Sequence, residues 1–175
     1  MVTALSGLLK NMAKGFNEKV TLREELKFLE DYITIEKMRY MEMFDVETEV
    51  EDEALYAARI IKLTLQPLVE NAIFSGIEPG GKNGSIHIRI WQEQAMLCIS
   101  VKDDGVGMTE EKIREIMETP QKRKGDTMSG IGLPNVDQRI KLVYGDAYGL
   151  TISSQVGEYT EILVKLPIEY GNEKK

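Results

Sequence analysis

Three short segments of this sequence contain residue types that could bind a phosphate or a metal ion. Segment 103–107 (DDGVG) places a carboxylate at the end of an alternating apolar run, before two glycines that allow close backbone approach to a ligand. Segment 130–133 (GIGL) precedes a helical pattern, whose free N–H groups and dipole favour an anion. Glu70-Asn71 is a polar pair within an apolar run. Taken singly, each segment has an ordinary structural explanation. Segment 103–107 could be an acidic turn, segment 130–133 a tight loop, and Glu70-Asn71 a solvent-facing stripe.

The elements that position these segments are predicted from hydrophobic periodicity. Thr21 and Glu24 form a capping box for a helix that runs to about Tyr40. Further helices are predicted at about 62–75, 109–117 and 133–144, and strands at 44–50, 86–90, 97–101, 150–154 and 160–166. Residues 118–129 have no period and predict a mobile basic loop. The pattern predicts an α+β fold: a two-layer sandwich of helices on a mixed, mostly antiparallel sheet, with an N-terminal helical arm.

Composition narrows the class of protein. The chain has 175 residues, 42% of them hydrophobic, which suits one compact domain with an attached arm. A net charge of −7 argues against nucleic acid as a partner. The single cysteine, Cys98, cannot form an internal disulfide and suits a reducing compartment. No apolar run approaches the roughly 18 to 20 residues that span a bilayer, so we expect a cytoplasmic domain.

The three segments together, in this order, resemble the GHKL or Bergerat ATP-binding fold of histidine kinases, gyrase and chaperone ATPases. More narrowly, segments 65–73 (LQPLVENAI) and 130–136 (GIGLPNV) look like those of LytS/YesM-type sensor histidine kinases. Segment 20–26 (VTLREEL) is similar to the helix that joins that family's phosphoacceptor region to its kinase domain. The resemblance implies two parts: residues 1–42 from the dimerisation and phosphoacceptor region with its connecting helix, and residues 43–170 as the ATP-binding catalytic domain.

The resemblance also implies a set of site residues. Asn71 would coordinate the Mg²⁺ that bridges the phosphates of ATP, with Glu70 in a supporting role that orients it. Asp103 would accept a hydrogen bond from the adenine amino group, and Thr160 would support it through water. Other implied nucleotide contacts are two glycines, two lysines of the basic loop and the second glycine segment: Gly105, Gly107, Lys122, Lys124, Gly130, Ile131, Gly132 and Leu133. For each of these two lysines, a place in a solvated run of charges is as good an explanation as a phosphate contact.

This sequence departs from the family pattern in two places. Phe74-Ser75 stands where relatives usually carry a basic-polar pair, which removes one phosphate cation and predicts weaker ATP binding. Asp104 stands where many relatives have Asn. The only histidine, His87, lies on a predicted strand and faces away from that strand's isoleucines, so its surroundings do not resemble a phosphoacceptor motif. By the resemblance, the phosphoacceptor histidine lies upstream of these residues.

The function that the resemblance implies is transfer of the ATP γ-phosphoryl group to a histidine on the phosphoacceptor helix of the parent kinase. That parent would be a membrane-anchored homodimer that passes the phosphoryl group to a response regulator. One alternative is a non-catalytic nucleotide-sensing module. A GHKL ATPase is disfavoured, because such enzymes carry a glutamate four residues before the asparagine, where this chain has Pro67.

Overall fold

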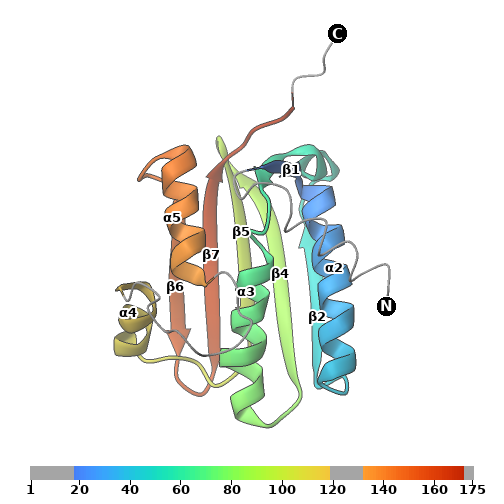
Figure 1. Ribbon diagram of the computed structural model, residues 1–175, viewed down its shortest axis with the longest axis vertical. Helices are drawn as coiled ribbons and strands as arrows, with labels where there is room; N and C mark the ends of the chain where they lie inside the picture. Colours follow the sequence, from blue (N-terminus) through green and yellow to red (C-terminus); the bar gives the residue numbers. More distant parts are fainter. Residues whose placement is uncertain (1–17, 119–131, 172–175) are drawn as a thin grey trace.

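A five-stranded sheet forms one layer of the molecule, and helices α2, α3 and α5 cover one of its faces (Figure 1). The computed structural model describes residues 18–118 and 132–171. The strand order is β2-β4-β5-β7-β6, in which β2 and β4 are parallel and the other neighbours are antiparallel. The strands are β2 Phe44–Val50, β4 Gly84–Glu93, β5 Met96–Asp103, β6 Gly149–Gln155 and β7 Tyr159–Pro167. The predicted α+β fold with a mixed, mostly antiparallel sheet is confirmed.

Strand β4 illustrates how alternation builds the two faces of the sheet. Ile86, Ile88 and Ile90 are buried under the helices, while the residues between them point to the opposite face. His87 is one of these, and its exposed ring lies 3.2 Å from Glu47 of β2. The predicted surface position of this histidine is confirmed.

Helix α2, Leu22–Arg39, begins at the predicted capping box. The Thr21 hydroxyl accepts the backbone N–H of Glu24 at 3.2 Å, and the Glu24 carboxylate accepts the N–H of Thr21 at 2.8 Å. Its buried side, which includes Leu22, Leu29 and Tyr32, packs into the same hydrophobic core as the sheet. Helix α2 and the sheet therefore share one hydrophobic core.

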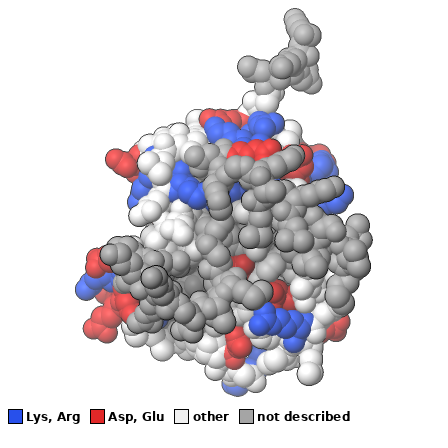
Figure 2. Space-filling model, viewed as in Figure 1, with Lys and Arg blue, Asp and Glu red and all other residues white. Residues whose placement is uncertain are grey.

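Helices α4, Glu110–Glu118, and α5, Leu133–Tyr144, agree with the predicted ranges. Thr109 accepts the N–H of Lys112 at 3.2 Å at the start of α4, and α5 ends at Gly145, whose φ of +98° suits glycine. No residue of α4 is fully buried, and its acidic side chains gather at one edge of the surface (Figure 2). The predicted loop 118–129 lies almost entirely outside the described residues.

The helix predicted over 62–75 is wrong in its first four residues. Arg59–Ile61 form strand β3, which pairs with β1, Lys19–Thr21, and the helix α3 spans only Gln66–Asn71. Residues 62–65 form a turn in which Leu63 has a φ of +59°. This turn replaces helix because its N–H groups are hydrogen-bonded to a side chain of α2, an interaction that local periodicity cannot reveal.

Beyond α3 the helix changes pitch instead of ending. Ala72–Ile77 form a π-helical turn, η2, and Glu78–Gly80 a 3-10 turn, η3; another 3-10 turn, η1, spans Glu53–Ala57. Such π turns frequently lie at functional sites. Within the described ranges, no helix is both long enough and apolar enough to cross a membrane.

Candidate functional site

Asp103, the last residue of β5, is the buried carboxylate of the first glycine segment. Its relative exposure is 2%, and in the sheet register it lies between Ile86 of β4 and Thr160 of β7. Its Oδ1 accepts the backbone N–H of Gly105 at 2.9 Å. Burial raises the pKa of Asp103 to about 6, and the charge of Asp104 adds to this rise while the Gly105 hydrogen bond opposes it.

The glycines around Asp103 make room first for the protein's own backbone. A Cβ at Gly105 would lie 2.2 Å from the carbonyl oxygen of Gly76, and a Cβ at Gly107 would lie 2.1 Å from that of Gln155. Gly107 also has a φ of +66°, which favours glycine. A Cβ at Gly76 would lie 2.3 Å from Oδ1 of Asp103 itself. Larger side chains at these positions would therefore displace the carboxylate or its neighbours.

Gly76 was not singled out from the sequence, although it contacts the site. It belongs to η2, and its carbonyl accepts the N–H of Val106 at 2.9 Å. The π turn thereby ties the segment that follows Asp103 to the helix that ends at Asn71. The sequence carries no signal for this contact, because Gly76 directly follows the predicted helix over 62–75, where a glycine is typical of a helix end.

Thr160 is buried beside Asp103 and belongs to a small hydroxyl network. Its Oγ1 lies 2.9 Å from Oγ of Ser154, which accepts the N–H of Met108 at 2.7 Å and donates to the carbonyl of Tyr159 at 2.7 Å. Ser154 has a single proton and donates it to Tyr159, so Thr160 is the donor between the two hydroxyls. The lone pairs of Thr160 are left as acceptors. Ser154 is a second residue that the sequence interpretation missed.

Asn71 ends α3, and its amide is partly buried at the start of the π turn. Its Nδ2 is buried and has no hydrogen-bond partner within residues 18–118 and 132–171. Glu70 accepts a hydrogen bond from Gln66 Nε2 at 2.9 Å, and no hydrogen bond joins it to Asn71 in the described structure. Burial raises the pKa of Glu70, and the charge of Glu36 on α2 adds to the rise.

The second glycine segment is described only in part. Gly132 is the N-cap residue of α5 and offers no side-chain cap. Its carbonyl accepts the N–H groups of Asn135 and Val136, at 3.0 and 3.3 Å, and Pro134 has no N–H, so this helix start offers a ligand at most the N–H of Leu133. Leu133 is buried at the first helical position. The other implied contacts of this region, Lys122, Lys124, Gly130 and Ile131, lie outside the described residues.

Phe74, at the position where the resemblance predicts a basic residue, packs against the end of α2. Its ring centroid lies 5.8 Å from that of Tyr40, with an interplanar angle of 60°. Ser75 is exposed. Phe74 therefore supports the contact between η2 and α2.

Asp104, which follows Asp103, is exposed, as strand alternation predicts. Its Oδ1 accepts the N–H of Ser85 at 2.7 Å. The two adjacent aspartates therefore differ in environment, because one is buried among glycines and the other faces solvent.

Residues 57–170 match the family described as histidine kinase-, DNA gyrase B-, and HSP90-like ATPase, and residues 1–44 match a histidine kinase family. The chain is 36% identical over 167 residues to the sensor histidine kinase YesM of Bacillus subtilis, covering 95% of this chain and 27% of that protein. It is 30% identical over 172 residues to the sensor protein kinase HptS of Staphylococcus aureus, covering 98% of this chain and 32% of that protein. The chain thus spans about a third or less of these relatives.

Solved structures with the same fold include the catalytic domain of histidine kinase ThkA, with a TM-score of 0.60 and 20% identity over 86% of this chain and 95% of that chain. ThkA in complex with the response regulator protein TrrA matches 99% of this chain and 48% of that chain, with a TM-score of 0.57 and 22% identity. At these identities the likeness concerns the fold.

Proposed function

Because this chain belongs to the histidine kinase-, DNA gyrase B- and HSP90-like ATPases, and within them to the sensor histidine kinases, we propose that it binds Mg-ATP for phosphoryl transfer to a histidine. The acceptor would lie on the phosphoacceptor helix of the parent kinase, and a response regulator would receive the phosphoryl group. Residues 43–170 would be the catalytic domain, and residues 1–42 its link to the phosphoacceptor region. The parent would be a membrane-anchored homodimer.

The buried carboxylate of Asp103 is the observation that carries this proposal. A carboxylate has about four acceptor positions, and Gly105 occupies one of them. The second oxygen of Asp103, Oδ2, would accept a hydrogen bond from the adenine amino group. The free lone pairs of Thr160 suit a water molecule that bridges to the same base.

Asn71 is the residue that we propose for the metal. Within the described residues there is no group of three or more His, Cys, Asp or Glu side chains that could hold a metal ion. A magnesium ion here would therefore take one amide oxygen from Asn71 and its remaining ligands from phosphates and water, as is usual for nucleotide sites. A ligand in this position would also satisfy the orphaned amide, because water or phosphate oxygen can accept from Nδ2.

Transfer is favoured over hydrolysis by the residues around Asn71. The position four residues before it is Pro67, which is buried at the start of α3 and has no group that could activate water. Glu70 is hydrogen-bonded to Gln66. Phosphoryl transfer needs mainly positioning and electrostatic stabilisation from the protein, which this arrangement can supply.

Titration of nucleotides by calorimetry tests the proposal. A hydrogen bond to a charged group contributes about 1.5 to 3 kcal/mol, so Asp103→Ala should weaken ATP binding about ten- to a hundredfold. GTP should bind poorly, because guanine has a carbonyl acceptor where adenine has its amino group. Asp104→Ala is the matched control: it removes a neighbouring carboxylate that faces solvent, so ATP affinity should stay unchanged or improve slightly as repulsion with the phosphates is relieved.

If both variants lose the same affinity, or if GTP binds as tightly as ATP, then Asp103 is not the carboxylate that binds adenine.

Phosphorylation tests the reaction itself. With radiolabelled ATP, the chain alone should remain unlabelled, and the longer protein with its phosphoacceptor helix should acquire acid-labile phosphate. Acid-labile phosphate on His87 would contradict the proposal.

A further inference from the structure

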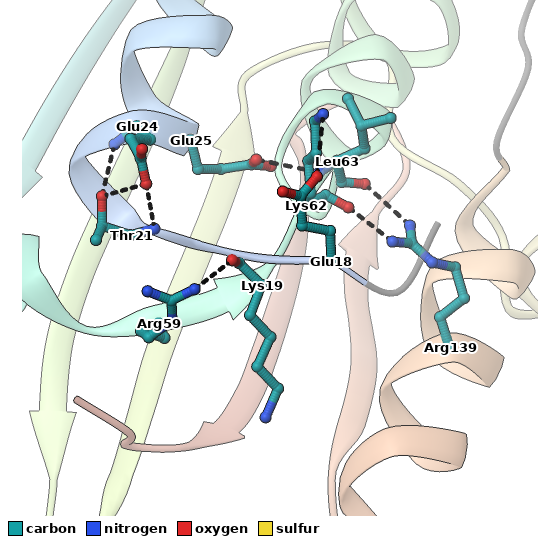
Figure 3. Close-up of polar contacts among 9 residues, drawn as sticks. All are labelled: Glu18, Lys19, Thr21, Glu24, Glu25, Arg59, Lys62, Leu63 and Arg139. Carbon is teal, nitrogen blue, oxygen red and sulfur yellow. Dashed lines mark hydrogen bonds and ion pairs between the residues drawn. The ribbon is translucent and has the colours of Figure 1, made fainter. Parts of the chain in front are cut away.

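The turn that leads into α3 is held from two sides by charged side chains of two other helices (Figure 3). From α2, the carboxylate of Glu25 accepts three consecutive backbone N–H groups, those of Leu63, Thr64 and Leu65, at 3.0, 2.8 and 3.0 Å. Glu25 is only 2% exposed. Three N–H groups converging on one anion form a nest, a backbone arrangement that anions stabilise.

From α5, the guanidinium of Arg139 lies on the carbonyl side of the same turn. Its Nη2 donates to the carbonyl oxygen of Lys62 at 2.7 Å, and its Nη1 lies 3.5 Å from that of Leu63. Leu63, between them, has a φ of +59°, a conformation that costs a non-glycine residue of order 1 kcal/mol or more. Glu25 and Arg139 together hold the turn in this strained form.

This turn fixes the first turn of the helix that carries Asn71. The carbonyl of Leu65 accepts the N–H groups of Leu68 and Val69, at 3.1 and 3.2 Å. Asn71 follows within the same short helix, whose length is six residues. A rotation or slide at residues 63–65 would therefore carry the Asn71 amide with it.

The charges of the clamp act on one another as well as on the backbone. Burial raises the pKa of Glu25, while the three N–H groups and the charge of Arg139 oppose that rise. Burial likewise lowers the pKa of Arg139, and the charge of Glu25 opposes that change. Each group thus favours the charged form of the other across the turn.

We propose that Glu25 and Arg139 are positioning residues for the metal ligand: by clamping residues 62–65 they set α3, and hence the Asn71 amide, relative to α2 and α5. The inference rests on the proposed role of Asn71 in binding magnesium. It connects the helix that leads to the phosphoacceptor region with the metal side of the nucleotide site. The adenine side, built on β5 and β7, is linked to this clamp indirectly, through η2, whose Gly76 carbonyl accepts the N–H of Val106, so we expect it to respond more weakly than the metal side.

The test separates the metal side from the adenine side. ADP is titrated into the protein once with magnesium and once with EDTA. The ratio of the two dissociation constants, here called the magnesium ratio, measures the metal-dependent part of binding. A titration of adenosine measures binding to the adenine pocket alone. Outer-shell partners of metal ligands typically affect metal affinity ten- to a hundredfold, so Glu25→Gln should reduce the magnesium ratio by about tenfold. Adenosine affinity should fall by a clearly smaller factor, because α3 reaches the adenine pocket only indirectly, through Gly76 and Val106.

Three further variants complete the design. Arg139→Lys keeps the charge but loses the planar pair of donors, and should reduce the magnesium ratio by a smaller factor; it also serves if Glu25→Gln does not fold. Glu30→Gln makes the same substitution at an exposed position of α2 and should leave the ratio unchanged. Asn71→Ala should abolish the magnesium dependence.

The outcomes distinguish the clamp from the proposed function. If Asn71→Ala removes the magnesium dependence while folded Glu25→Gln and Arg139→Lys keep it, the clamp does not position the ligand. Equal losses of adenosine and Mg-ADP affinity would likewise overturn the inference, since they indicate a general structural defect. A wild-type chain without any magnesium dependence would instead refute the role of Asn71 itself.

Discussion

Two carboxylates in this molecule are equally buried but differ in their hydrogen-bond partners. Glu25 and Asp103 are each 2% exposed. Glu25, at the turn before α3, accepts three backbone N–H groups and lies in the field of Arg139. Asp103, at the end of β5, accepts the N–H of Gly105, and the charge of Asp104 repels it.

The difference separates a carboxylate that holds the fold from one that is kept for a ligand. A buried charge whose acceptor positions are filled stabilises the arrangement around it, whereas a buried charge with open positions costs free energy until a donor arrives. Burial raises the pKa of both carboxylates, to about 6 for Asp103, so the distinction between them rests on their hydrogen-bond partners. We therefore expect opposite effects on stability when the Glu25 side chain, with its acceptor oxygens, is removed and when the charge of Asp103 is neutralised.

The largest effect is expected for Glu25→Ala. It leaves three buried N–H groups and the Arg139 guanidinium without their acceptor, and breaking one side of a buried charged contact costs about 3–5 kcal/mol. Urea denaturation should show a free energy of unfolding lower by that amount. A loss below about 1 kcal/mol, the typical net contribution of one hydrogen bond, would mean that Glu25 is not the anchor of the turn.

Asp103→Asn should have the opposite effect on stability. The substitution removes a poorly satisfied buried charge and keeps an oxygen that can accept from Gly105, so the free energy of unfolding at pH 7 should rise by about 3 kcal/mol. ATP affinity should fall in the same variant, because the amide presents an N–H to the adenine amino group. A variant less stable than the wild type would show that Asp103 supports the fold.

The pH dependence of this difference follows from the sign of the pKa change. The pKa of Asp103 rises from an ordinary value of 3.8 to about 6 in the folded chain, so its contribution to stability is present below about pH 4 and is lost as the pH rises through about 6. The complete rise corresponds to about 3 kcal/mol. Wild type and Asp103→Asn should therefore have similar stability near pH 4 and diverge towards pH 7.

The position and role of Asp103 are easier to predict from the sequence than those of Glu25. Asp103 ends an alternating strand and precedes two glycines, so its position follows from local pattern alone. The same holds for the capping box of Thr21 and Glu24 and for the stop of α5 at Gly145, because each signal lies within a few residues of its effect.

Glu25 could not be found in this way. In the sequence it stands beside Glu24 on an amphipathic helix and looks like a solvated residue, and its partners lie about 40 positions away. The same long-range contact shortens α3, which is why the predicted helix over 62–75 began too early. The π turn and the contact of Gly76 with Asp103 likewise depend on tertiary packing, which intrinsic propensity does not encode.

The smallest effect is expected for Thr160→Val, which tests how much of the Asp103 site depends on neutral partners. Valine has nearly the shape of threonine but lacks the hydroxyl that donates to Ser154, and Ser154 keeps its contacts with Met108 and Tyr159. One neutral hydrogen bond contributes about 1 kcal/mol, so the free energy of unfolding should fall by about that amount. If Thr160 also holds a water molecule against adenine, ATP affinity should fall about threefold. Thr151→Val, the same change at an exposed position of β6, is the control and should alter neither quantity. A loss of affinity as large as that of Asp103→Ala would show that the hydroxyl, and not the buried charge, is the main acceptor for the base.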